Sequence, residues 1–138
     1  MSKVSDRVQQ AIVAVQQHWL AHELAGEMAG LLGLCVDDVV WLPPNEPALR
    51  GKSAVAGWLA ALPENRIGRI EITNVHIDGS SGLVYKVADF TTSLETRGQA
   101  RNDPIIGSHL WVLREVSPEQ RRVAVVAWSI VEGKRRRA

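Results

Sequence analysis

The chain has 138 residues, of which 46% are hydrophobic and 22% are charged, and this composition is typical of one soluble globular domain. The net charge is +1, but residues 134–137 are all basic, and subtracting these four charges leaves −3 for the rest. A broad basic surface for nucleic acid is therefore excluded. No apolar run approaches the ~18 residues of a membrane span. The N-terminus shows no signal peptide, so we expect a cytoplasmic protein without membrane contact.

We predict a single domain over residues 1–133, followed by a basic tail at 134–138 that is a solvated terminus. The only cysteine, Cys35, excludes an internal disulfide and a cysteine-rich zinc site. It lies in the apolar run 31–36, which predicts a buried, unreactive thiol. The histidines have no partners at metal-ligand spacing, so no metal site is predicted.

Three helices are predicted in the N-terminal half. The first has apolar residues at three- and four-residue intervals, namely Val4, Val8, Ile12, Val15 and Trp19. This pattern is typical of an amphipathic helix, which should end at Gly26. A shorter helix follows around residues 28–32. Ser53 is predicted to cap the third helix, which should end at Pro63.

Strands are predicted at residues 39–42 and from residue 70 to the end. Apolar residues alternate at Ile70 and Ile72 and then change parity at Val75, which predicts a one-residue bulge near residues 73–74. Three long strands follow at 83–94, 105–116 and 123–131, separated by a polar loop at 95–103 and a turn at 117–119. The last strand is apolar on both faces and should be central in the sheet.

One stretch of the sequence carries a family resemblance. An apolar strand at residues 36–42 runs into Pro43-Pro44, and Gly51-Lys52-Ser53 then opens a helix. This order resembles the nuclear transport factor 2-like superfamily, which includes ketosteroid isomerase and the SnoaL-like cyclases. The resemblance implies an α+β fold of the cystatin-like type. In this fold a cone-shaped, strongly curved antiparallel sheet packs against three N-terminal helices around a ligand cavity.

The segment 18–42 is similar to ketosteroid isomerase without gaps, but the catalytic positions differ. That enzyme uses an Asp as general base, with a Tyr and a protonated Asp as oxyanion donors. The base position is Leu42 here, which cannot accept a proton. The Tyr position is His18, which can still donate a hydrogen bond, and the second Asp falls at or near Ser108. We therefore do not predict ketosteroid isomerase activity.

Related cyclases place an Asp or an Asp–His pair deeper on the sheet, and the corresponding candidate is Asp89. If Tyr85 lines the cavity, Asp89 shares its face by the two-residue period of a strand. The hairpin about the loop 95–103 would bring Asp89 near Ser108 or His109, as a general acid/base pair. The alternative is that Asp89 faces solvent and His109 has a structural role only.

Five tryptophans against one Phe and one Tyr form an unusual aromatic set. Large flat side chains can bind a planar apolar ligand by stacking, or they can simply fill the interior. The residues predicted to line the pocket are Trp19, Trp41, Trp58, Tyr85, Ser108 and Trp128.

We therefore expect a SnoaL-like protein that binds a small hydrophobic molecule. It would act without a cofactor as an isomerase, cyclase or dehydratase, through Asp89 with His18 or His109. The alternative is a non-catalytic ligand-binding or dimerisation module of the same fold. A homodimer is expected through the outer sheet face, where Lys86 would lie, because the strand with Trp111 and Leu113 is apolar on both faces.

Overall fold

The structure is a computed structural model that describes residues 4–62, 66–96, 99–100 and 103–131. Its elements, in chain order, are α1 (Asp6–Ala25), α2 (Met28–Gly33), β1 (Cys35–Leu42), β2 (Leu49–Arg50), α3 (Lys52–Ala60), β3 (Arg66–Gly79), β4 (Leu83–Thr96), β5 (Gln99–Ala100), β6 (Ile105–Ser117) and β7 (Gln120–Ile130). The basic tail predicted at 134–138 lies outside the described residues.

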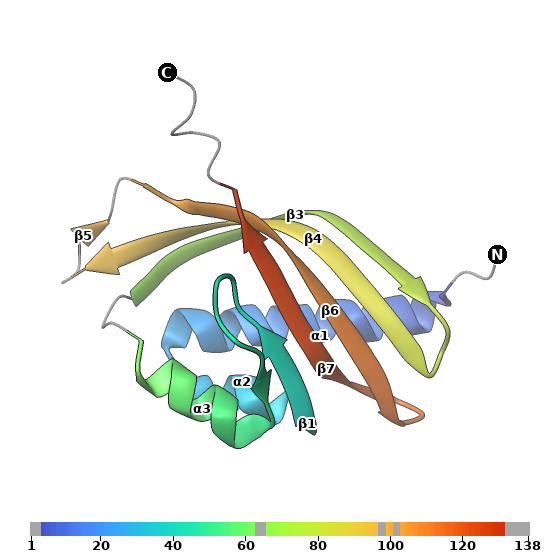
Figure 1. The fold of residues 1–138 in the computed structure, drawn as a ribbon. Helices are drawn as coiled ribbons and strands as arrows, with labels where there is room; N and C mark the ends of the chain where they lie inside the picture. Colours follow the sequence, from blue (N-terminus) through green and yellow to red (C-terminus); the bar gives the residue numbers. More distant parts are fainter. Residues whose placement is uncertain (1–3, 63–65, 97–98, 101–102, 132–138) are drawn as a thin grey trace.

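The strands form one curved sheet in the order β2-β1-β7-β6-β4-β3, and β5 pairs with β4. Figure 1 shows the three helices on the same side of this sheet, with α1 running along it. The predicted α+β cone with three N-terminal helices is confirmed. The central place of the last strand is also confirmed, since β7 lies between β1 and β6. The β1–β7 pair is parallel, while the other pairs are antiparallel.

Helix α1 has clear signals at both ends. The Ser5 hydroxyl accepts a hydrogen bond from the backbone N–H of Val8 at 3.3 Å, which satisfies one of the free donors at the helix start. Gly26 ends the helix with a φ of 73°, a left-handed conformation that glycine adopts without strain. Ile12 and Trp19 on the apolar stripe are buried against the sheet.

The predicted cap at Ser53 is wrong, because α3 begins at Lys52, two residues earlier than a cap at Ser53 would place its start. Gly51 occupies the cap position with a φ of 88°, and its N–H donates to the carbonyl of Val39 at 2.7 Å. The pairing of β2 with β1 therefore fixes the chain up to Gly51, and the helix starts immediately after it. The loop predicted at 95–103 also differs, since it contains β5.

The predicted bulge is confirmed as a shift in the β3–β4 register between Thr73 and His76. Asn74 has a φ of 54° at this point, which is an uncommon conformation for a residue other than glycine. The bulge changes which residues of β3 face the helices. Ile72 pairs with Phe90 before the bulge, and Ile77 pairs with Lys86 after it.

The inner face of β4 carries Val84, Lys86 and Ala88, which are at most 1% exposed, whereas Tyr85 and Val87 are 36% and 37% exposed. The expectation that Lys86 lies on the outer face is therefore wrong. Lys86 faces the helices, since side chains alternate along a strand.

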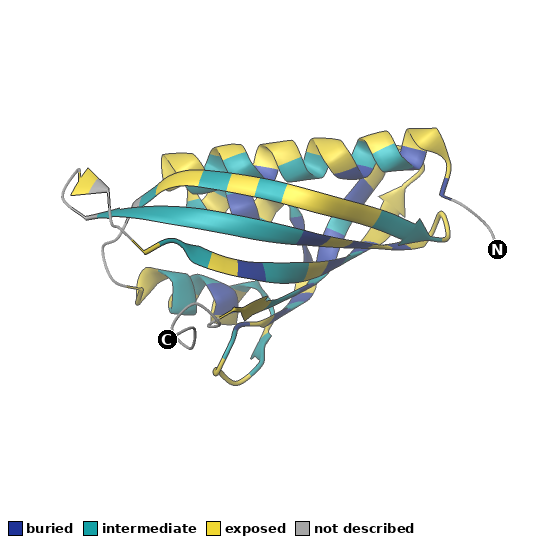
Figure 2. Cartoon of the chain, turned by 90° about the horizontal axis from the view of Figure 1, so that it is seen from above, coloured by how far each residue is buried: buried dark blue, intermediate teal, exposed yellow. Residues whose placement is uncertain are grey.

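On the neighbouring strand β6, Trp111 and Leu113 are buried in the core, so they do not contribute to the apolar surface of the outer face. Figure 2 shows half-buried and exposed residues over most of the outer face.

Cys35 is fully buried, which confirms the predicted buried thiol. The thiol donates a hydrogen bond to the carbonyl of Leu31 at 3.5 Å. Burial raises the pKa of this thiol to about 11, which keeps it protonated and unreactive at neutral pH. Among the described residues, no helix is both long and apolar enough to cross a membrane. The cytoplasmic location stays a prediction.

Candidate functional site

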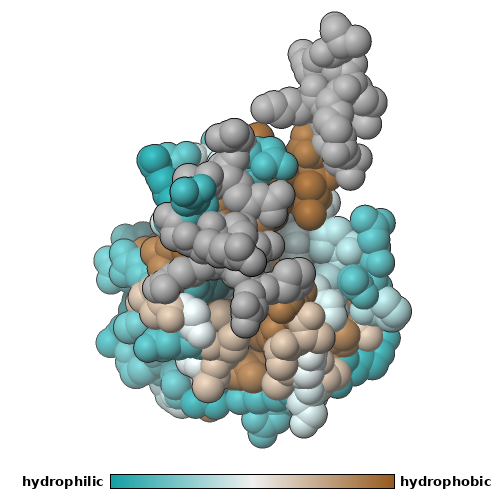
Figure 3. Space-filling view, turned by 90° about the vertical axis from the view of Figure 1, so that its left-hand side faces the viewer, coloured by the Kyte–Doolittle hydropathy of each residue, from teal (hydrophilic) through white to brown (hydrophobic). Residues whose placement is uncertain are grey.

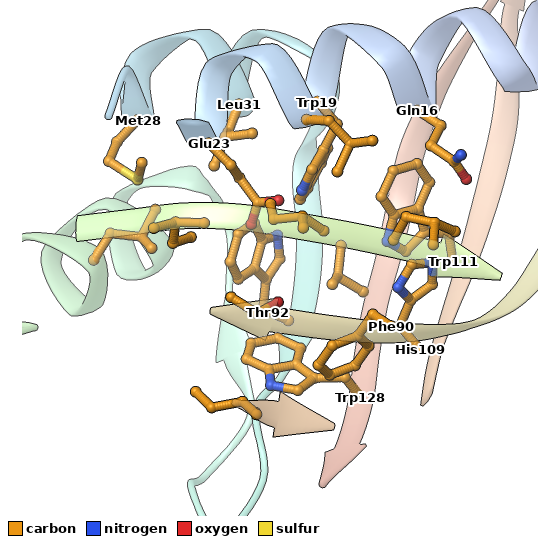
Figure 4. A pocket seen from close by; sticks show the side chains of 18 of the residues that line it. Gln16, Trp19, Glu23, Met28, Leu31, Phe90, Thr92, His109, Trp111 and Trp128 are labelled. Atoms are coloured by element: carbon orange, nitrogen blue, oxygen red, sulfur yellow. The ribbon is translucent and has the colours of Figure 1, made fainter. Parts of the chain in front are cut away.

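A cavity of about 610 Å³ lies between the helices and the inner face of the sheet. Figure 4 shows side chains from α1 projecting toward the strands that form the opposite wall. The wall is mostly apolar and includes Leu62 and Ile130, which are 44% and 43% exposed. The apolar lining therefore continues to the surface, and Figure 3 shows hydrophobic side chains gathered at one end of the molecule.

All five tryptophans line this cavity. Trp19 of α1 stacks on Trp41 with ring centroids 5.7 Å apart and contacts Trp111 at 4.7 Å. Trp128 meets both Trp41 and Trp58 edge to face at 6.0 Å. Such aromatic pairs add stability beyond the area that they bury. The tryptophans therefore form connected walls with fixed orientations, and a flat apolar molecule could stack on them.

Glu23 is the only carboxylate among the described residues of the cavity wall. It lies on α1 four residues after Trp19, on the same face of the helix. Glu23 is half-buried, and the partial loss of water around its carboxyl group raises its pKa from the ordinary 4.5 to about 7, while a hydrogen bond from Trp19 and the positive charge of Lys86 act in the opposite direction. Glu23 can therefore gain or lose a proton near neutral pH, which a general acid or base requires.

Lys86 of β4 is fully buried at the edge of the same cavity. Its ammonium donates a hydrogen bond to Oε1 of Gln16 and lies 3.7 Å from the ring centroid of Trp111. The cation and the aromatic face attract each other. Burial nevertheless lowers the pKa of Lys86 from 10.5 to about 7, and the negative charge of Glu23 opposes this shift.

His109 of β6 lies between two aromatic rings on the inner face. Its ring stacks on Trp111 at 5.2 Å and on Phe90 at 6.1 Å. Burial and the charge of Lys86 lower its pKa to about 3, against the influence of Asp89. The imidazole is therefore neutral, and its buried Nε2 has no hydrogen-bond partner among the described residues.

Asp89 does not line the cavity, and the expectation that it shares the pocket with Tyr85 is wrong. Both side chains point to the outer face, where Oδ1 of Asp89 accepts from Ser108 at 2.8 Å and Oδ2 accepts from Asn74 at 2.7 Å. These two hydrogen bonds lower the pKa of Asp89. Ser108 was also predicted to line the pocket, but it lies on the outer face with Asp89. His109 is on the opposite side of the sheet, because consecutive residues alternate.

His18 is exposed on α1 and does not line the cavity, so its predicted place in the site is also wrong. The structure places Trp19, Trp41, Trp58, Trp128 and His109 on the wall. Sequence reasoning missed Glu23, Lys86 and Trp111. The signal for Glu23 was its position four residues beyond Trp19, where the apolar stripe of the first helix should continue.

A family model described as the SnoaL-like domain matches residues 16–135 of the chain. A search of curated proteins found no match. Three solved structures illustrate the likeness in fold. A ketosteroid isomerase-like protein from Erwinia carotovora atroseptica is 19% identical, with a TM-score of 0.73 over 89% of this chain and 95% of that chain. A conserved protein from Planctomyces limnophilus is also 19% identical, with a TM-score of 0.76 over 92% and 100%.

An NTF2-like protein with a cystatin-like fold from Novosphingobium aromaticivorans is 11% identical, with a TM-score of 0.73 over 91% of this chain and 82% of that chain. At these identities the solved structures show the fold alone, and the family rests on the domain match. The chain belongs to the SnoaL-like domain family.

Proposed function

We propose that the chain binds a small hydrophobic molecule in its cavity and moves a proton on it without a cofactor. The reaction would be an isomerisation, cyclisation or dehydration. The observation that carries this proposal is Glu23, a carboxyl group with a pKa of about 7 on the wall of an apolar cavity. General acids and bases work best when their pKa is near the working pH.

The role expected for Asp89 passes to Glu23 in this proposal. Asp89 accepts two hydrogen bonds on the outer face, and these favour its charged form and make it a weak base. Glu23 has an apolar environment, which makes its carboxylate a stronger base. Removal of a proton next to a carbonyl group is the reaction that fits this base, because its carboxylate form can accept that proton near neutral pH.

Proton exchange tests the proposal without knowledge of the natural substrate. We suggest incubating the protein in D₂O with planar apolar ketones such as 2-tetralone and following deuterium uptake next to the carbonyl by NMR. Glu23→Gln keeps the size of the side chain and removes the base, so exchange should fall at least about 100-fold, as is typical for loss of a general base. Asp89→Asn is the matched control and should exchange as the wild type does. Wild-type rates in Glu23→Gln would refute the role of Glu23, and binding without any exchange would favour the non-catalytic module.

We further propose that two copies of the chain associate through the outer face of the sheet. Four large apolar side chains on this face, Tyr85, Val87, Ile106 and Leu110, are between 36% and 39% exposed. Apolar groups gathered on one sheet face are typical of an interaction surface. The pairing of β6 with β4 brings Leu110 opposite Val87, so these side chains form one patch.

The mass in solution tests the homodimer. Light scattering at micromolar concentration should give twice the mass of one chain, and Leu110→Lys should give the mass of a monomer because it places a charge in the patch. Leu24→Lys is the matched control, since Leu24 is 39% exposed on α1, away from the sheet face. A wild-type protein with the monomer mass would contradict this proposal.

A further inference from the structure

The buried ammonium group of Lys86 forms no ion pair with a carboxylate of the described residues, and the negative charge of Glu23 acts on it only from a longer distance. No carboxylate oxygen in this part of the chain lies within 4.0 Å of its Nζ; the nearest described partners are the neutral Gln16 amide and the face of Trp111. An ammonium group has three N–H donors, and among the described residues only the Gln16 oxygen accepts a hydrogen bond from it. Buried charges in proteins are normally paired and hydrogen-bonded, so this arrangement is incomplete.

His109 adds a second incomplete group beside Lys86. Lys86 and His109 border the same cavity, and both side chains contact Trp111. The ammonium group lies 3.7 Å from the centroid of the Trp111 ring, and the imidazole stacks on that ring at 5.2 Å. The neutral imidazole carries one N–H, and its Nε2 is buried without a partner in the described structure. Buried polar atoms are rarely left unpaired in native proteins.

We propose that the ligand of this cavity is an apolar organic acid whose carboxylate lies against Lys86 and His109. A carboxylate would supply both the missing negative charge and the missing acceptors, and charge-assisted hydrogen bonds of this kind are the stronger ones. The tryptophan walls would hold the apolar body of the acid. This inference rests on the proposed function, since it names the class of molecule that the cavity receives.

The distance along α1 between Gln16 and Glu23 indicates the length of this molecule. Gln16, which contacts Lys86, lies seven residues before Glu23 on α1, and seven residues of helix span roughly 10 Å. The carboxylate and the position where Glu23 moves a proton would therefore be separated by roughly 10 Å, about the length of a two-ring aromatic acid. Trp19 lies between these positions on the same helix face and contacts Trp111.

The affinity for such an acid should depend on pH. The described titratable groups that border this part of the cavity are Lys86, His109 and Glu23, while Asp89 lies behind the sheet. Below about pH 7 Lys86 is charged and Glu23 is neutral, which favours an anion. Above about pH 7 Lys86 becomes neutral and Glu23 becomes negative, so the anion should bind more weakly.

Two isosteric probes, 2-naphthoate and the neutral 2-naphthamide, test the inference by isothermal titration calorimetry. The wild type should bind 2-naphthoate at least about tenfold more tightly than 2-naphthamide at pH 6, which is the expected effect of one charge-assisted hydrogen bond. The preference should shrink as the pH is raised to 9. Lys86→Met keeps the length of the side chain and should abolish the preference without weakening 2-naphthamide.

His109→Phe keeps the aromatic stack and should reduce the preference by several-fold, so the test does not depend on one variant. Lys52→Met, which removes a cation that pairs with Asp37 at the surface, should leave the preference unchanged. Equal affinity for the two probes in the wild type, or an undiminished preference in Lys86→Met, would overturn the inference. Glu23→Gln should lose proton exchange but retain the preference, so the two proposals can fail separately. If neither 2-naphthoate nor 2-naphthamide bound to the wild type, both proposals would be overturned.

Discussion

Replacing Glu23 by Gln should make the folded protein more stable above pH 7, although it removes a proposed functional group. The folded state holds the carboxyl proton up to about pH 7, whereas the ordinary pKa is 4.5. The free energy of unfolding of the wild type therefore decreases as the pH rises from about 4.5 to about 7, because the unfolded state loses this proton first. The loss is complete above pH 7.

The magnitude follows from the shift in pKa. Each pKa unit corresponds to about 1.4 kcal/mol, so the rise in the pKa of Glu23 limits the difference in unfolding free energy to about 3 kcal/mol. The attraction between Glu23 and Lys86 offsets part of it, since the variant loses that attraction too. We therefore expect Glu23→Gln to exceed the wild type by roughly 1–3 kcal/mol at pH 8 and to differ little from it at pH 4.5.

Urea unfolding between pH 4.5 and pH 9 measures this difference directly. Glu119→Gln is a suitable control, because its side chain is 70% exposed in a surface ion pair with Arg7, and such pairs contribute little to stability. A gain for Glu23→Gln that is independent of pH would refute burial of a titrating carboxyl group. A stability loss that grows with pH would show that the Glu23 carboxylate stabilises the fold.

Three further predictions concern the same interior. Lys86→Met should be more stable than the wild type in urea at pH 6, where the folded wild type carries a charge that burial disfavours, and the advantage should disappear toward pH 10, because the folded state releases this proton above about pH 7 while the unfolded state keeps it up to its ordinary pKa of 10.5. Trp19→Ala should lose about 3–5 kcal/mol of unfolding free energy in the same assay, whereas the partly buried Trp58→Ala should lose less. Gly107→Ala should lower the melting temperature measured by circular dichroism, because its Cβ would lie 1.9 Å from the carbonyl oxygen of Ser129 on β7.

The fold was predictable because its signals are local and strong. The stripe of the first helix, the glycine that ends it and the change of parity near Asn74 each have a direct physical meaning. The start of α3 was misplaced because Ser53 is a good cap by residue type, while the β1–β2 pairing that fixes Gly51 cannot be seen in the sequence. Long-range pairing decided this boundary against local preference.

The site was harder to predict because both faces of β4 and β6 are apolar. Alternation places Tyr85 and Asp89 on one face and Lys86 on the other, but it does not say which face meets the helices. Charged residues usually lie outside, so Lys86 was expected on the outer face. That choice assigned Tyr85 and Asp89 to the cavity face, which is the reverse of the observed orientation of the strand. The structure reverses this choice because Val84 and Ala88 fill the core.

The energetic arguments point to a cavity that does more than complete a fold. Buried charged groups usually weaken a protein, and apolar residues of similar size would often be equally or more stabilising. Both Glu23 and Lys86 have pKa values displaced against their charged forms, so each destabilises the folded state over part of the pH range. The tryptophans of the wall, by contrast, pack against one another and stabilise it. Destabilising polar groups inside an otherwise apolar interior are characteristic of functional sites, and these two groups border the same cavity as the His109 nitrogen that has no partner within the described part of the chain.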